Sequence, residues 1–298
     1  MKKYIFTASV LCLTLFASGC GAKVTEEPIA SDNIENIIYT NITTENDKKI
    51  LTTLMDNAGI SKERQNILFE HTEQFNSAVK PEELTNGFEE IKIGETKYDP
   101  YDIQDEWVES YPDFFGYNCR ITAFSLFEDF MDIPTGSETN DYITLFDKSS
   151  LETDSSAMVN TDSIDKFSVL YSTVPTEETK DIDVHIDNMQ RAWEEKGITF
   201  NDNNSASLVS VVFHGQDDGD FLFIGHTGIL FEAEDGIYFL EKIAFQEPYQ
   251  LVKLKDRQAL SDYMMIKYDV EENQPTASPF ILENDELIEG YRTASEIA

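Results

Sequence analysis

Four strand-like runs lie close together in the second half of the chain, at 207–213, 221–225, 227–232 and 237–245. Two of the separators, 216–220 and 234–236, are rich in Asp and Gly, which is the composition of tight turns. Consecutive strands joined by turns this short pair with their sequence neighbours in antiparallel fashion. This block therefore predicts an antiparallel meander, and any fold for the chain must be built around it.

Apolar residues at helical spacing predict helices over 47–58, from 61 onwards, from 119 onwards, over 183–196 and after 256. Ser61, Asn118 and Asp256 are the expected N-caps. The helix that begins at Cys119 is apolar on almost every side, which is typical of a buried helix. Helices followed by a meander indicate an α+β fold in one domain, 46–298.

Two long segments carry weaker patterns. Residues 82–114 are acidic and aromatic, include Pro100 and Pro112, and are expected to be irregular. Residues 135–180 are rich in Ser, Thr and Asp and are expected to form an insertion, with weak strand content over 167–171.

The N-terminus has the pattern of an export signal. Lys2 and Lys3 precede an apolar stretch that is too short to span a bilayer as a mature helix. The segment Ala17-Ser18-Gly19-Cys20 resembles a bacterial lipobox, whose Cys is acylated and becomes the new N-terminus; an ordinary secretory peptide is the alternative. We therefore expect a signal peptide over 1–19 and a flexible tether over 20–45. The predicted location is the extracellular face of the cell membrane, where the lipid on Cys20 contacts the bilayer.

The negative charge of the chain argues against two kinds of partner, nucleic acid and anionic lipid headgroups. The precursor has a formal net charge of −35 at pH 7, and removing Lys2 and Lys3 gives −35 − 2 = −37. Such a surface repels nucleic acid and anionic lipid headgroups, so neither is an expected partner. The sequence does not predict the oligomeric state.

The cysteines point to one free thiol. Cys12 leaves with the signal and Cys20 takes the lipid, so Cys119 has no intrachain partner. A leftover thiol in an exported protein is a candidate for reactivity. Cys119 lies at a helix start, where the helix dipole stabilises a thiolate, and His226 in a predicted strand can act as its base. We therefore predict Cys119 as nucleophile and His226 as base.

A third polar group usually orients such a histidine. If Glu232 faces Ile237 across a four-residue loop, Glu241 lies diagonally opposite His226 on the same face of the sheet. In another register Gln246 or Glu247 would be the better orienter. Donors for an oxyanion are expected from the backbone N–H of Cys119 and from the side chain of Tyr117.

Competing sites are weaker. His214 is a rival base, but its place at a strand end favours a surface or turn role, and His71 and His185 are expected on the surface. The four histidines are not clustered, which argues against zinc. Residues 217–220 could bind Ca²⁺ but fit a hairpin turn better. No cofactor is expected.

The motifs resemble a known enzyme group. Tyr-x-Cys opening a helix, followed by Gly-His-x-Gly-Ile and a second strand ending in a polar residue, is similar to the NlpC/P60 branch of papain-like cysteine peptidases. This resemblance implies a papain-like core, with Cys119, His226 and Glu241 as catalytic residues and cell-wall peptides as substrates. The chain departs from that pattern at Asn118 and Arg120, and its Cys-to-His gap of 226 − 119 = 107 residues is long.

Most of the mature chain resembles a second group. The segments 115–124, 223–230, 241–250 and 289–292 are similar to the domain-of-unknown-function 4300 family, lipoproteins of Gram-positive bacteria. That resemblance implies a location but no activity. The sequence therefore favours a membrane-anchored extracellular cysteine hydrolase, an amidase or peptidase. A catalytically inactive papain-like binding module is the alternative.

Overall fold

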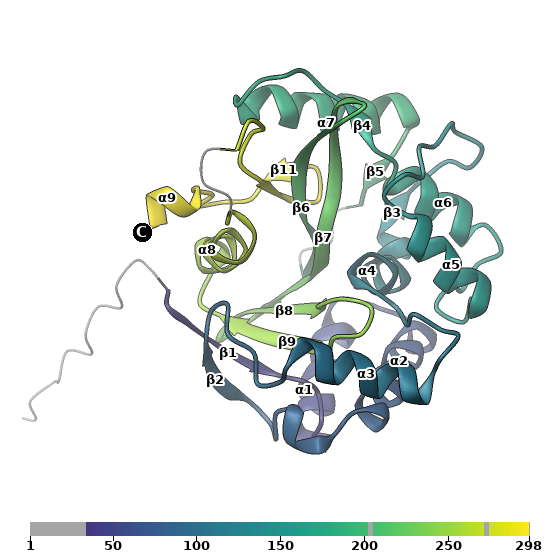
Figure 1. Cartoon of the computed structure of the whole chain (residues 1–298), viewed down its shortest axis with the longest axis vertical. Coiled ribbons are helices and arrows are strands. Elements are labelled where there is room, and N and C mark those ends of the chain that lie inside the picture. The colour runs from purple at the N-terminus through teal and green to yellow at the C-terminus, as the bar shows by residue number, and fades with distance from the viewer. Residues whose placement is uncertain (1–33, 202–204, 271–273, 298) are drawn as a thin grey trace, which may run out of the picture. The chain divides into compact units, whose positions relative to one another are not determined.

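The predicted meander forms the centre of the fold (Figure 1). The computed structural model describes residues 34–201, 205–270 and 274–297. Its meander strands are β6 (Ala206–Asp217), β7 (Gly219–Ala233), β8 (Gly236–Lys242) and β9 (Tyr249–Leu254). They lie side by side in the order β6-β7-β8-β9, at the centre of a nine-stranded sheet in which every pairing is antiparallel. Together with the helices, this confirms the α+β class.

The two runs predicted over 221–225 and 227–232 are one strand, β7, with an irregularity between them. Val211 pairs with His226 and Val212 pairs with Ile224, so Gly225 is an extra residue in β7. Such a bulge reverses the alternation of side chains along a strand. Glycine is required here, because a Cβ on Gly225 would lie 2.5 Å from the Phe213 ring.

Strands from both ends of the chain extend the meander. On one side β9 pairs with β1 (Asn36–Thr40), which pairs with β2 (Glu89–Lys92). On the other side β6 pairs with β10 (Phe280–Glu283), next to β11 (Glu286–Leu287). Of the short strands, β4 (Val174–Pro175) pairs with β7, and β3 (Met131–Asp132) pairs with β5 (Thr199–Phe200).

The strand β1 corrects the expected tether of 20–45, because residues 36–40 belong to the sheet. The expected signal peptide and Cys20 lie outside the described residues. Within the described part of the chain, no helix has both the length and the apolar character needed to cross a membrane.

Five helices lie where the sequence predicted them, and three of them begin directly after their expected caps. They are α1 (Glu45–Asn57), α2 (Lys62–Ala78), α4 (Cys119–Phe127), α7 (Ile182–Lys196) and α8 (Arg257–Tyr268). Ser61, Asn118 and Asp256 each accept a hydrogen bond from a backbone N–H in the first turn of the helix that follows.

The two segments expected to be irregular contain helices. Asp99 caps α3 (Pro100–Ser110), and Pro100 occupies the first turn, where its missing N–H costs nothing. The insertion holds α5 (Leu145–Thr153) and α6 (Ser163–Leu170). The strand expected over 167–171 is therefore wrong, because packing of Phe167 on Phe124 of α4 favours a helix there. Short helical turns lie at η1 (Pro81–Glu83), η2 (Glu128–Phe130) and α9 (Ala294–Ile297).

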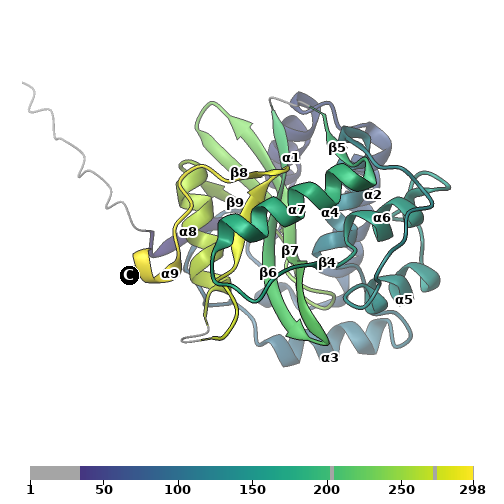
Figure 2. The same cartoon turned by 90° about the horizontal axis from the view of Figure 1, so that it is seen from above.

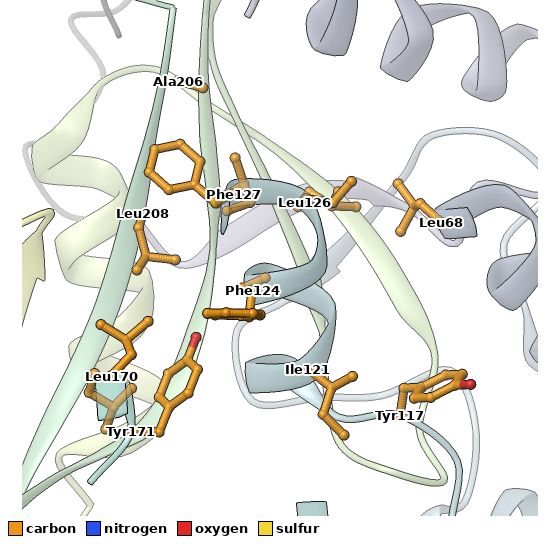
Figure 3. Close-up of a cluster of buried hydrophobic side chains, with 14 of the residues drawn as sticks. Leu68, Tyr117, Ile121, Phe124, Leu126, Phe127, Leu170, Tyr171, Ala206 and Leu208 are labelled. Atoms are coloured by element: carbon orange, nitrogen blue, oxygen red, sulfur yellow. The ribbon is translucent and has the colours of Figure 1, made fainter. Parts of the chain in front are cut away.

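Helices cover both faces of the sheet (Figure 2). On one face α8 packs on residues that include Val209, Leu230 and Val252. On the other face α4 is buried along its whole length. Figure 3 shows Phe124 and Phe127 of α4 directed toward Leu208 of β6, and Ile121 and Leu126 on its other side toward α2. The sheet and α2 thus pack against opposite sides of α4.

Candidate active site

Polar contacts fix the N-terminus of α4, where Cys119 is the first helical residue. Asn118 accepts from the N–H of Ile121 at 3.0 Å and donates to Asp147 Oδ1 at 2.8 Å. Asp147, in α5, also binds the guanidinium of Arg120 through both of its oxygens, at 2.8 and 2.7 Å. Asp147 is fully buried, so this pair is shielded from solvent. The insertion therefore holds the start of the helix that carries the thiol.

The thiol lies beside the bulge in β7. The register of β7 with β8 begins at Gly228, so the part of β7 before it pairs with β6 and β4 only. The N-terminus of α4 approaches β7 there: Arg120 donates to Ile224 O at 3.2 Å, and Cys119 Sγ lies 3.9 Å from Gly225 O. The bulge places His226 near Cys119, close enough for each side chain to shift the pKa of the other.

Glu241 binds the far side of the imidazole. His226 Nε2 lies 2.5 Å from Glu241 Oε2. An ionised carboxylate can only accept, so Nε2 carries the proton and Nδ1 is left for the thiol. Glu232 pairs with Ile237 as predicted, although Ala233 also pairs with Gly236, so the turn has two residues and not four.

Three residues that sequence reasoning missed surround Glu241. Gln250 Nε2 and the Tyr263 hydroxyl donate to Glu241 Oε1 at 2.5 and 2.6 Å, and Lys267 Nζ lies 3.8 Å from Oε2. Gln250 follows directly from the β8–β9 register, in which it pairs with Glu241. Tyr263 and Lys267 lie on α8, and no local sequence pattern connects that helix with the carboxylate.

The surroundings of Glu241, His226 and Cys119 favour the charged form of each of these three groups. Burial opposes ionisation of Glu241, but Lys267 and His226 outweigh it and lower its pKa from 4.5 to about 2. Burial also opposes the imidazolium, but the Cys119 thiolate and Glu241 raise the pKa of His226 to about 9. Burial would raise the pKa of Cys119, but His226 and then Arg120 bring it below its ordinary value. The arrangement therefore favours a thiolate–imidazolium pair held by a carboxylate.

A buried lysine shapes the loop between β8 and β9. Lys242 Nζ donates to the carbonyl oxygens of Ala244, Phe245 and Glu247, and it lies 4.1 Å from the centre of the Phe75 ring. Burial lowers the pKa of Lys242, yet three acceptors need three N–H donors, which only the ammonium form has.

The loop bound by Lys242 packs closely against the segment that leads to Cys119. A Cβ on Gly116, whose φ is +90°, would lie 2.7 Å from Phe245 O, so the close approach requires glycine. The loop and the thiol segment therefore hold each other in place.

A cleft of about 370 Å³ lies next to this network. The cleft is lined by residues of β1, the 91–98 segment, the β8–β9 loop and α8, among them Tyr98, Glu247, Gln250, Lys267 and Tyr268. The Tyr268 ring stacks on His226, with 5.0 Å between ring centres and 28° between ring planes. Cys119 and His226 are themselves 5% and 2% exposed. Tyr268 therefore contacts both the cleft and the imidazole.

The sequence matches one known family. Residues 38–288 match the family described as Domain of unknown function (DUF4300). The chain belongs to this family. No curated protein and no solved structure matches the chain.

Other predicted oxyanion and orienting groups lie elsewhere. The Tyr117 hydroxyl contacts Ser156 Oγ at 3.1 Å and donates to Asp154 O at 3.3 Å, so its donor is already used. Glu247 accepts from the Tyr98 hydroxyl at 2.7 Å, and the bond to His226 comes from Glu241 and not from Glu247 or Gln246.

Two of the three remaining histidines, His185 and His214, are buried. His185 is fully buried, with Nδ1 2.7 Å from Thr176 Oγ1, and its ring lies 4.5 Å from that of His214. His214 is also buried, and its Nε2 lies 2.8 Å from Asp220 Oδ1. Burial lowers the pKa of His71 to about 4. The surface roles expected for His185 and His214 are wrong because both rings fill packed sites, whereas His71 is half-buried, with its ring 4.2 Å from that of Tyr117.

The Asp-rich segment 217–220 forms the β6–β7 hairpin, where Asp217 pairs with Gly219, as the turn interpretation predicted. Within the described residues, no cluster of three or more His, Cys, Asp or Glu side chains could hold a metal ion. The site itself offers a thiol, an imidazole and a carboxylate.

Proposed function

We propose that the protein is a membrane-anchored extracellular cysteine hydrolase that cleaves amide bonds. The observation that carries the proposal is that the Cys119 thiol, at the start of α4, lies near His226, whose imidazole binds the buried carboxylate of Glu241. A thiolate is the nucleophile in such enzymes, and the imidazolium supplies the proton that an amine leaving group needs. The similarity of the motifs to NlpC/P60 peptidases supports a papain-like arrangement and cell-wall peptides as substrates.

In this reaction Cys119 forms an acyl-thioester with the substrate, and the amine leaves with a proton from His226. Water then attacks the thioester carbonyl and gives a proton to His226. The C–S bond breaks, the carboxylic acid leaves, and the thiolate–imidazolium pair is restored. Glu241 accepts from Nε2 throughout and keeps Nδ1 directed at the sulfur. Location on the membrane rests on the lipobox-like segment that ends at Cys20.

The test is turnover of cell-wall stem peptides by purified variants. We expect Cys119→Ala and His226→Ala to abolish cleavage, and Glu241→Gln to weaken it by a smaller factor, because the dyad remains but loses its orientation. Asp235→Asn, in the exposed β7–β8 turn, is the matched control and should keep full activity. Full turnover by Cys119→Ala would refute the proposal.

Anchoring has its own test. Cys20→Ser should release the protein into the medium or leave the precursor unprocessed. If the variant and the wild type fractionate alike with the membrane, lipidation at Cys20 is wrong.

One observation favours a second function. Because Cys119 and His226 are almost fully buried, a binding module that keeps the fold without catalysis would look the same. That reading is correct if the wild type cleaves no peptide or amide and Cys119 resists alkylation in the folded protein.

A further inference from the structure

We propose that Tyr268 is a catalytic residue whose hydroxyl donates a hydrogen bond to the substrate's carbonyl oxygen as it becomes an oxyanion, and that the cleft of about 370 Å³ admits that substrate. This inference rests on the proposed hydrolase function. It assigns the donor that Tyr117 cannot supply, because the Tyr117 hydroxyl is already bonded to Ser156 and Asp154.

Tyr268 lies between the cleft and His226. Tyr268 is the last residue of α8 and lines the cleft, and its ring stacks on His226. The ring is therefore fixed between the open space and the imidazole. A substrate group bound in the cleft would contact this side chain.

The state of its hydroxyl is the second argument. Across the described residues, no hydrogen bond joins the Tyr268 hydroxyl to another group, whereas Tyr98 and Tyr263, which line the same cleft, each donate to a carboxylate. A half-buried tyrosine hydroxyl ordinarily has a partner. A substrate oxygen in the cleft would provide one.

Electrostatics keep this donor protonated. Burial, and then the negative charges of Glu241 and Cys119, raise the pKa of Tyr268 well above its ordinary value. The hydroxyl therefore keeps its proton near neutral pH. It can donate to an oxyanion without losing its proton, as an oxyanion donor must.

The step balances without any further reagent. The Cys119 sulfur forms a bond to the carbonyl carbon, and the π electrons of the C=O bond move onto the oxygen. Tyr268 and the backbone N–H of Cys119 donate to that oxygen; the latter is one of the N–H groups that a helix start leaves without an intrahelical acceptor. The C=O bond then reforms, the C–N bond breaks, and the amine takes its proton from His226.

Two probes of the same thiol separate this role from a structural one. p-Nitrophenyl acetate acylates a thiol through a tetrahedral oxyanion, whereas iodoacetamide alkylates it by direct displacement and forms none. In Tyr268→Phe, which keeps the ring on His226, we expect acylation to slow by on the order of 10²-fold while the rate and pH profile of alkylation stay unchanged. Tyr268→Leu, which also loses the stacking, should slow both reactions.

The outcomes are distinguishable. Unchanged acylation in Tyr268→Phe, or equal slowing of acylation and alkylation, overturns the role of the hydroxyl while leaving the hydrolase proposal in place. If the wild type reacts with neither probe in its folded state, the hydrolase proposal itself fails. Circular dichroism of both variants establishes that each is folded before the rates are compared.

Discussion

Replacing Glu241 with Gln should destabilise the protein in a pH-dependent way. The substitution keeps the size of the side chain but removes its charge. Glu241 accepts from three donors, on His226, Gln250 and Tyr263. In the variant the amide NH₂ must face one of these donors, and the imidazolium loses its counter-ion. Both changes occur where solvent cannot compensate, because Glu241 is 1% exposed.

The size of the effect follows from the pKa of His226, which rises from 6.5 to about 9. That difference corresponds to roughly 3 kcal/mol in favour of the imidazolium, a part of which comes from the Cys119 thiolate. Because a raised pKa stabilises the fold while the group is protonated, this contribution is complete below pH 6.5 and is lost as the pH rises through about 9. The Glu241 carboxylate, with its pKa lowered from 4.5 to about 2, contributes fully above pH 4.5.

We therefore expect Glu241→Gln to lower the free energy of unfolding by about 2 kcal/mol near pH 6, and by about 1 kcal/mol near pH 10, where mainly the neutral hydrogen bonds are affected. Urea unfolding followed by the fluorescence of the two tryptophans measures both values. Glu247→Gln is the matched control: its carboxylate accepts from Tyr98 on the rim of the cleft, and its loss should be about 1 kcal/mol or less at both pH values. An equal loss at both pH values for Glu241→Gln would refute the ion pair.

Two more predictions concern the residues that hold the thiol in place. Asp147→Asn should lower the free energy of unfolding by about 3–5 kcal/mol, because it leaves the buried charge of Arg120 unpaired. The control Asp141→Asn, at a partly exposed ion pair, should cost about 1 kcal/mol or less. Thermal unfolding of both variants measures the difference, and equal shifts in Tm would contradict this prediction. Lys242→Met should speed amide hydrogen exchange in the β8–β9 loop, because three carbonyl oxygens lose their donor; unchanged protection of the Ile243 and Glu247 amides would contradict this role.

Local patterns were sufficient for the parts of the site that lie on single elements. Asn118 caps α4 because a side-chain oxygen before an apolar run satisfies a free N–H, and this interaction needs only nearby residues. The pairing of Glu232 with Ile237 follows from the turn, and it alone places Glu241 near His226. Such contacts depend on spacing along the chain, so the sequence contains them.

The parts that could not be predicted depend on distant segments. Asp147 reaches Asn118 and Arg120 from an insertion without clear periodicity, and Tyr268 reaches His226 from a helix on the other face of the sheet. The sequence also did not show that β7 is one continuous strand. At the Gly225 bulge the alternation of side chains reverses, so the strand looks like two separate runs. Packing between elements decides these contacts, and a single sequence does not show which elements pack.

The ionisation of Cys119 tests the central claim most directly. The ultraviolet absorbance of the thiolate, measured against pH as the difference between the wild type and Cys119→Ala, reports this one thiol. We predict that Cys119 titrates below its ordinary value of 9.0, and that in His226→Ala the titration moves to higher pH, because burial then acts without the imidazolium. A thiol that titrates at the same pH in both proteins, at or above 9.0, would contradict the account.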